Sequence, residues 1–387
     1  MDTRSIETNS EHAQAYANYV PEFPDSVAVE KVIEELRGID GVTNPNAIRL
    51  LRREFHEMVL GERTEPIVIS GNCSRRISAD EPISKIVSEI AAQREIAEEV
   101  FGENVTFISR DPGQNFKPRS SAVEHSRDGE AYPSYFGDGI NGMNFDQRTP
   151  DPSRMVAAAL QARDIQQNMT GDPIRTAHEA LVPAYERCFV IHEGQKAYLL
   201  SADLPWLGSR TRNINGPQVE FLSKIENPIG IKIDAQVKPE EIRELYQTLN
   251  PGSYPGKLVF TLRLGRGKKL AKAPLILDAI KCYAPNSLLM IDPMHGNTYL
   301  TKGGKKTRAV SDIIAETRAI GEAAKTKELR LHGIHVEATG RFITRECVSV
   351  KGEEPRGENA DVDPQLNNAE LKLVLEAFRE SINRRDG

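Results

Sequence analysis

The chain has 387 residues, of which 39% are hydrophobic, and its formal net charge at pH 7 is −6. This acidic balance gives no electrostatic reason to expect a nucleic acid or a membrane surface as a partner. No apolar run approaches the roughly 20 residues that cross a bilayer, and the polar N-terminus lacks the apolar core of a signal peptide. The four cysteines are scattered without paired spacing, so we expect a soluble, cytoplasmic protein with neither a disulfide framework nor a zinc knuckle.

An extension over residues 1–62 is expected to precede the main domain, which we place at 63–387. Residues 1–26 look irregular, whereas residues 27–36 and 46–60 have helical character.

Strand-like runs then alternate with helical patterns. The eight strand candidates are residues 66–71, 104–110, 174–180, 197–204, 228–233, 257–264, 287–292 and 329–338. Apolar residues at helical spacing separate most of them, for example Ile83, Ile86 and Ile90 after a potential cap at Asp80, and a last helix is expected at 365–383. Eight such units favour an α/β fold, the (β/α)₈ TIM barrel. An open doubly wound sheet is the alternative, but no Gly-x-Gly-x-x-Gly follows the first strand.

Nearly every strand candidate ends in a charged or reactive residue. In a barrel these ends converge on one mouth, where catalytic groups lie. Burying so many charges without partners would cost several kcal/mol each, so a shared ligand is expected there. The residues at or near these ends are Cys73, Arg110, His178 with Glu179, Arg210, Lys232, Arg263, His295 and Glu337.

Chemistry separates two sets among them. The cations suit phosphate and carboxylate groups, because Arg binds these in a bidentate way and Lys acts as a point charge. They are Arg110, Arg210, Lys232 and Arg263, helped by Lys117 and Arg119. The second set offers a thiolate, an imidazole and two carboxylates, which suit Mn²⁺, Co²⁺ or Fe²⁺. It comprises Cys73, His295, Glu337 and a later acid, Asp363.

Each of these residues alone also has a structural interpretation. A histidine at a strand end is more often hydrogen-bonded than metal-bound, and a lone cysteine is more often a small buried hydrophobe. The joint pattern favours a site.

Twelve short motifs, in order along the chain, resemble type II 3-deoxy-D-arabino-heptulosonate 7-phosphate (DAHP) synthases. They are GNC (71–73), RDPGQNFKPRSS (110–121), GDGING (137–142), HEALVPAYE (178–186), GSRTRNINGPQ (208–218), NPIGIK (227–232), LRLG (262–265), DPMHGNT (292–298), KTR (306–308), GIHVEATG (333–340), TREC (344–347) and DPQLN (363–367). The resemblance implies a barrel enzyme that joins phosphoenolpyruvate to erythrose 4-phosphate with one divalent metal ion. The reaction opens the shikimate pathway or serves a secondary-metabolite branch.

The resemblance also implies roles for individual residues. The implied metal ligands are Cys73, His295, Glu337 and Asp363. The implied phosphoenolpyruvate contacts are Arg110, Arg210, Lys232 and Arg263, with Lys117 nearby. The implied aldose phosphate contacts are Arg119, Ser120, Asn141 and Lys306 or Arg308. The candidates for catalytic roles are Lys117, Glu179, Arg210 and Lys232, and the proton carrier stays open. Relatives commonly form dimers or tetramers, so a homo-oligomer is expected.

Several positions depart from the family pattern. The usual GDCAE is GNCSR here, GERTR has become GSRTR with Ser209, and RMGN has become RLGR with Arg266. Two alternatives therefore stay open: the same chemistry on another acceptor, such as an amino-substituted aldose phosphate, and a non-catalytic homologue that binds a phosphometabolite. Only 23 residues separate Arg154 from His178, where longer relatives carry a helical pair linked to feedback. We expect weak or absent inhibition by tryptophan and phenylalanine.

Overall fold

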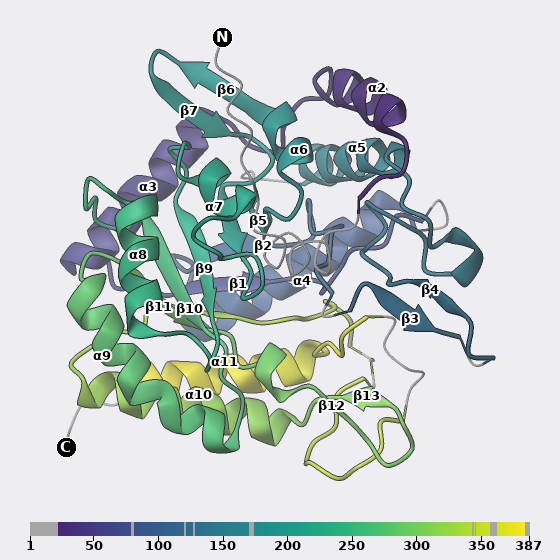
Figure 1. Ribbon diagram of the computed structural model, residues 1–387. Coiled ribbons are helices and arrows are strands. Elements are labelled where there is room, and N and C mark those ends of the chain that lie inside the picture. The colour runs from purple at the N-terminus through teal and green to yellow at the C-terminus, as the bar shows by residue number, and fades with distance from the viewer. Residues whose placement is uncertain are drawn as a thin grey trace.

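The computed structural model describes residues 22–78, 81–119, 121–126, 128–169, 174–342, 344, 346–356 and 362–383. Strands form a barrel at its centre (Figure 1). The barrel is closed and consists of eight parallel strands in the order β1-β14-β11-β10-β9-β8-β5-β2. The strands are β1 (Ile67–Ser70), β2 (Thr106–Ser109), β5 (Arg175–Glu179), β8 (Leu204–Leu207), β9 (Ile229–Ile233), β10 (Leu258–Leu262), β11 (Leu288–Ile291) and β14 (Gly333–His335). The predicted (β/α)₈ barrel is confirmed.

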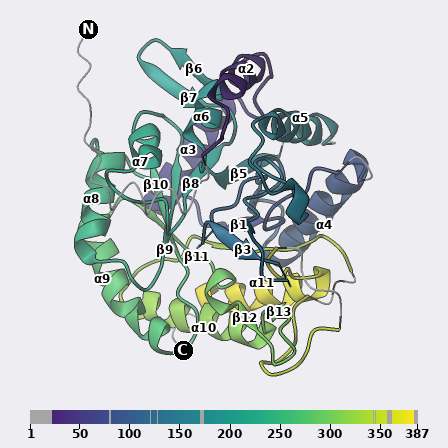
Figure 2. The ribbon, with the colours of Figure 1, turned by 45° about the vertical axis from the view of Figure 1, so that its right-hand side comes forward.

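Helices surround this barrel (Figure 2). They are α4 (Ile83–Phe101), α5 (Ser153–Asn168), α6 (Pro183–Glu186), α7 (Pro217–Leu222), α8 (Pro239–Leu249), α9 (Ala273–Tyr283), α10 (Val310–Thr326) and α11 (Asn368–Asn383). Helix α8 shows how the sequence determines a helix. Pro239 is its first residue, and Ile242, Leu245 and Leu249 form its buried face. Among the described residues, no helix is long and apolar enough to cross a membrane.

The predicted N-terminal helices are α2 (Ser26–Leu36) and α3 (Pro45–Leu60). Three residues of α3, Leu51, Phe55 and Met58, share one buried apolar cluster with residues of the barrel strands, including Val259 and Met290. Helix α3 therefore packs directly on the barrel core, and the boundary at residue 62 stays a prediction.

The fourth strand prediction was partly wrong. Residues 197–204 cover most of β7 (Lys196–Leu199), which pairs antiparallel with β6 (Val190–Glu193), and only the first residue of the barrel strand β8. Two apolar runs lie close together here, and parallel pairing with β5 and β9 selects the second for the barrel.

Two helix starts also differ from the prediction. Helix α11 begins at Asn368, because Asn367 and Glu370 form a reciprocal cap in which each side chain accepts the other's backbone N–H at 3.0 Å. Helix α4 follows Pro82, and the predicted cap Asp80 lies outside the described residues.

Two small hairpins, β3–β4 (Val123–His125 with Ala131–Pro133) and β12–β13 (Tyr299–Leu300 with Lys306–Thr307), lie in the loops that follow β2 and β11.

Candidate active site

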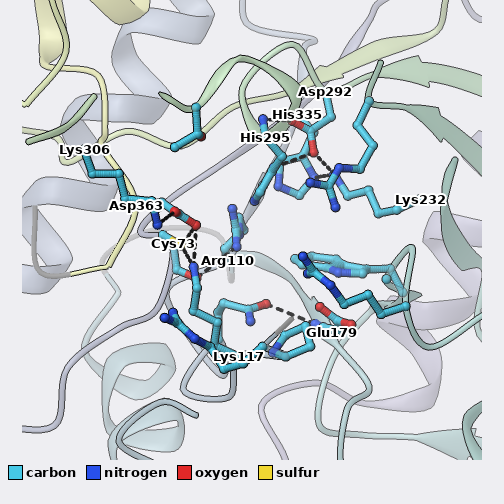
Figure 3. A pocket seen from close by; sticks show the side chains of 18 residues that line it. Cys73, Arg110, Lys117, Glu179, Lys232, Asp292, His295, Lys306, His335 and Asp363 are labelled. Atoms are coloured by element: carbon cyan, nitrogen blue, oxygen red, sulfur yellow. Dashed lines mark hydrogen bonds and ion pairs between the residues drawn. The ribbon is translucent and has the colours of Figure 1, made fainter. Parts of the chain in front are cut away.

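A cavity of about 260 Å³ lies among residues at and just beyond the C-terminal ends of the barrel strands (Figure 3). The predicted site residues that line it are Cys73, Arg110, Lys117, Arg119, Glu179, Arg210, Lys232, Arg263, His295, Lys306 and Asp363. Glu337 and Arg308 lie directly behind this lining, because Glu337 pairs with both Arg110 (2.9 Å) and Arg308 (2.6 Å). Thus thirteen of the fifteen predicted residues gather in one region.

The expected metal ligands come together from distant loops. Potential ligand atoms of Cys73, Glu337 and Asp363 all lie within 4.8 Å of one another, and all three residues are buried. His295 adjoins this group, with its Nε2 2.9 Å from Glu337 Oε1. Thiol, imidazole and carboxylate donors fit a first-row divalent ion.

The pKa values of two expected ligands, Cys73 and Asp363, are shifted in opposite directions. Burial raises the pKa of the Cys73 thiol, so a thiolate there needs a strong cation beside it. Burial alone would also raise the pKa of Asp363, but Lys117 and Arg308 hold it well below its usual range. A buried donor group of this kind is suited to hold a cation.

Lys117 links this donor group to the cavity. Its Nζ lies 2.5 Å from both Cys73 Sγ and Asp363 Oδ2, and Lys306 pairs with the other oxygen of Asp363. Burial would lower the pKa of Lys117, yet the neighbouring acids raise it overall, so the side chain stays an ammonium. A substrate oxygen near the donor group would meet this charge.

Lys232 anchors the cationic side of the cavity. Its Nζ lies 2.7 Å from Asp292 Oδ2 and 2.7 Å from His335 Nδ1. Burial lowers the pKa of Lys232 to about 8, although Asp292 opposes the shift. The Trp206 ring lies beneath both Arg110 and Lys232, with its centroid 5.3 and 5.7 Å from their charges.

In the motif DPMHGN (292–297), Asp292 fixes the position of His295. Asp292 Oδ1 accepts the backbone N–H groups of Met294 and His295, and Asp292 Oδ2 accepts from His295 Nδ1 at 2.7 Å. This bond orients the ring so that Nε2 faces Glu337, an arrangement typical of metal-binding histidines.

Glycine at 296 is required by a close approach of two loops. A Cβ at Gly296 would lie 2.3 Å from the backbone nitrogen of Gly265, in the loop that follows Arg263. Asn297 then donates to Glu316 of α10 at 2.6 Å, and Glu316 accepts the backbone N–H groups of Leu264 and Gly265. The loops that carry Arg263 and His295 are thereby fixed to one helix.

Glu179 enters the cavity, whereas its neighbour His178 points to the opposite face of β5 and contacts Glu186 at 2.9 Å. Burial raises the pKa of Glu179, although Thr211, Arg210 and Arg263 oppose the shift. A Cβ at Gly208 would lie 2.1 Å from Glu179 Oε1, so only glycine leaves room for this carboxyl group. Such a group can accept or return a proton.

Two of the predicted substrate contacts do not line the cavity. Asn141 is one of them, and its buried amide hydrogen-bonds, among the described residues, to backbone groups of residues 134, 136 and 148. Arg308 is fully buried behind Glu337 and also donates to the backbone oxygen of Pro364 at 2.5 Å. Ser120 lies outside the described residues.

Sequence reasoning assigned no role to Trp206 or Asp292. Trp206 is the single tryptophan of the chain and lies in the segment where the fourth strand was misplaced. Asp292 directly follows a buried strand, which was the available signal for it.

The departures from the family pattern have distinct surroundings. Ser209 Oγ accepts from Arg263 Nη1 at 3.3 Å, and both line a second cavity of about 750 Å³ beside the first. Arg266 is held by Asp312 of α10 at 2.5 Å, so its charge is paired.

Comparison with known proteins gives consistent matches. Residues 7–170 and 159–374 match the class-II DAHP synthetase family. The chain is 29% identical to phospho-2-dehydro-3-deoxyheptonate aldolase of Streptomyces coelicolor. The match covers 93% of this chain and 95% of that protein. The enzyme of that name from Neurospora crassa is 28% identical over 85% of this chain and 83% of its own. A probable phospho-2-dehydro-3-deoxyheptonate aldolase of Pseudomonas fluorescens is 29% identical over 93% of this chain and 94% of its own. As the ordered motifs predicted, the chain belongs to the class-II DAHP synthetase family.

Proposed function

We propose that this enzyme condenses phosphoenolpyruvate with erythrose 4-phosphate and water to give DAHP and phosphate. Membership of the family makes it a transferase of the DAHP synthase type. The observation that carries the proposal is the meeting of a cationic cavity with the buried Cys73, Glu337 and Asp363 group at one barrel mouth.

Phosphoenolpyruvate carries a carboxylate and a phosphate, which require several cations at fixed positions. Arg110 and Lys232 are held against the Trp206 ring, and Arg210 and Arg263 line the same cavity. We assign these four cations to the phosphoenolpyruvate cradle, where they also stabilise charge on the departing phosphate.

The acceptor sugar belongs on the other side, beside the donor group. Cys73, His295, Glu337 and Asp363 would hold one divalent ion, with Mn²⁺, Co²⁺ and Fe²⁺ as the candidates. When bound, this ion supplies Lewis-acid polarisation of an aldehyde oxygen. Lys306, which pairs with Asp363, and Arg119 both line the cavity and are the proposed contacts for the sugar phosphate.

The reaction then needs orientation and two proton movements. The cradle directs the phosphoenolpyruvate methylene carbon at the aldehyde carbon, so the new carbon–carbon bond forms between positioned partners. Lys117, whose Nζ lies 2.5 Å from Cys73 Sγ, is our candidate to donate a proton to the aldehyde oxygen. Water adds to the electron-poor carbon of phosphoenolpyruvate, Glu179 takes its proton, and phosphate leaves the tetrahedral carbon.

Ser209 motivates a second candidate, the same chemistry on another acceptor such as an amino-substituted aldose phosphate. A serine stands there where the family pattern has glutamate, and it touches Arg263 at the cavity edge. This change leaves the donor group and most of the cradle untouched.

The test is phosphoenolpyruvate consumption by metal-stripped protein, before and after Mn²⁺ or Co²⁺ is restored, with a panel of aldose phosphates. Metal-dependent formation of DAHP from erythrose 4-phosphate, identified by mass spectrometry, supports the proposal. Turnover only with another aldehyde supports the altered acceptor. Failure with every aldehyde, in protein that is folded and metal-loaded, refutes catalysis and favours the phosphometabolite-binding homologue.

Two further parts of the proposal rest on the resemblance and the composition. We propose a cytoplasmic homo-oligomer, a dimer or a tetramer, and analytical ultracentrifugation tests the assembly.

A further inference from the structure

A buried network of charges lies beside the metal-ligand loops. Its central residue is Arg75, which follows Cys73 by two positions and is 2% exposed. The guanidinium of Arg75 contacts Asp111 with Nε (2.9 Å) and Nη2 (2.7 Å), and it reaches Glu81 at 3.2 Å and Glu89 at 3.3 Å. Arg75 stands where the family pattern GDCAE has an acid.

Asp111 connects Arg75 to both functional loops. It is fully buried and adjoins Arg110 in the chain. Its Oδ1 also accepts from Asn72, from the side-chain Nδ2 at 2.7 Å and from the backbone N–H at 3.2 Å. Cys73 therefore lies between two residues, Asn72 and Arg75, that are both held by one carboxylate.

Backbone contacts strengthen this clamp between the loops that follow β1 and β2. The backbone N–H of Arg75 donates to the carbonyl of Gln114 at 2.8 Å. The Asn115 side chain donates to the carbonyl of Arg75 at 2.9 Å, and Arg110 Nη2 donates to the carbonyl of Cys73 at 3.2 Å. The Cys73 loop thus has little freedom relative to Arg110.

The loop after β14, which carries Glu337, joins the same network. Arg341 in that loop contacts Glu89 at 2.5 Å and Glu81 at 3.1 Å, the two acids that Arg75 also contacts. Glu89 lies on α4, which therefore bridges the loops that carry Cys73 and Glu337.

We propose that Arg75 is a positioning residue for the metal centre, which holds Cys73 at ligand distance from Glu337 and Asp363. The inference rests on the proposed metal site. Without Arg75, the buried carboxylates of Asp111 and Glu89 lose their shared partner. Such carboxylates draw in water or protons, and Asn72 and Cys73 move with them. Arg75 acts through Asp111, through its own loop and through the acids that it shares with Arg341, because it does not line the cavity.

The test uses the whole chain, stripped of metal and titrated with Co²⁺ alone. Cobalt bound to a thiolate gives a near-ultraviolet charge-transfer band, which reports Cys73 in the metal sphere without any need for turnover. The variants are Arg75→Met, Arg75→Lys and Asp111→Asn. Arg175→Met is the matched control, because it removes an arginine that pairs with Glu54 of α3, away from the cavity.

Arg75→Met and Asp111→Asn should raise the dissociation constant for Co²⁺ by about 10- to 100-fold and weaken the band, as the loss of residues that support metal ligands does elsewhere. Arg75→Lys keeps the charge but loses the two-nitrogen contact with Asp111, so its dissociation constant for Co²⁺ should lie between those of these variants and that of the wild type. The control should lose thermal stability with an unchanged band.

The inference is overturned if Arg75→Met binds Co²⁺ as tightly as the wild type with an undiminished band. If Arg75→Met does not fold, the inference is overturned when both Arg75→Lys and Asp111→Asn bind Co²⁺ as tightly as the wild type with an undiminished band. No thiolate band in the wild type would instead refute the placement of the metal at Cys73, and with it the metal centre of the proposed function.

Discussion

Replacing Asp292 with asparagine should shift the pH dependence of catalysis. Asp292 is fully buried and accepts from Lys232 Nζ and His295 Nδ1, each at 2.7 Å. Asparagine keeps the size of the side chain and one accepting oxygen but removes the negative charge. Lys232 would then face Arg110 and Arg263 without its counter-ion.

The contact between Lys232 Nζ and Asp292 Oδ2 is 2.7 Å, so an estimate made for charges about 4 Å apart is a lower bound on their interaction. Two unit charges about 4 Å apart interact by about 4 kcal/mol at an effective dielectric constant of about 20, which corresponds to roughly three pKa units. We adopt a fall of at least about one unit, because polar neighbours compensate for part of the loss. Since the pKa of Lys232 is about 8, a one-unit fall lowers the protonated fraction at pH 8 from about one half to about one tenth.

The direction of the pH shift depends on which protonation state of Lys232 binds the substrate. The cradle needs the ammonium form, so activity is lost as pH rises through the pKa of Lys232. The alkaline limb of kcat/KM, which reports the free enzyme, should therefore move to lower pH in Asp292→Asn by at least about one unit. The loss of kcat/KM should be about fivefold larger at pH 8 than at pH 6.

The assay is phosphoenolpyruvate consumption from pH 6 to 9 with saturating metal. Asp203→Asn is the control, because Asp203 is a buried carboxylate that accepts from Thr176 on β5 and does not line the cavity. It should lower stability and leave the alkaline limb in place. An equal loss at every pH in Asp292→Asn would mean that Asp292 acts through His295 alone, and the argument about Lys232 would be wrong.

Three further predictions concern the ligands, the cradle and regulation. Cys73→Ala and His295→Ala should each abolish metal-dependent turnover while circular dichroism stays unchanged, and normal activity in either would remove that residue from the ligand set. Arg263→Ala should raise the KM for phosphoenolpyruvate by about 10- to 100-fold, since a charge-assisted bond contributes about 1.5–3 kcal/mol; steady-state kinetics with both parameters unchanged would exclude it from the cradle. Tryptophan and phenylalanine, titrated during turnover, should inhibit weakly or not at all, because between Arg154 and His178 the described residues form only the rest of α5 and the start of β5. Clear inhibition would show that a regulatory site exists elsewhere.

The sequence was most informative where one residue both ends a strand and carries charge. Arg110, Lys232 and Arg263 each lie at or beside the end of a short apolar run, so barrel geometry alone placed them at one mouth. The same reasoning selected Cys73, His295 and Glu337, to which the chemistry of the donor set added Asp363 as a later acid.

What the sequence could not supply was the identity of partners that are distant in the chain. No residue close to Lys232 in the sequence indicates that its counter-ion is Asp292, which lies 60 residues later in the chain. Asn141 shows the converse limit: a polar residue in a glycine-rich motif can bind a ligand or fix its own loop, and only its three backbone hydrogen bonds show that it does the second. Trp206 was missed because the predicted strand ended at residue 204, so Trp206 fell in a loop and not in the barrel strand from which it lines the cavity.

The pairings at the mouth imply that metal and phosphoenolpyruvate bind cooperatively. Glu337, an expected ligand, pairs with Arg110 of the proposed cradle, and the expected ligand Asp363 pairs with Lys117. A divalent cation that attracts these carboxylates weakens their hold on the two side chains, whose charges then become available to an anionic substrate. Because such coupling is reciprocal, phosphoenolpyruvate should tighten metal binding by the factor by which metal tightens phosphoenolpyruvate binding. Calorimetric titrations of each with and without the other measure both factors, and the absence of any coupling would mean that the pairs with Glu337 and Asp363 do not limit how Arg110 and Lys117 meet the substrate.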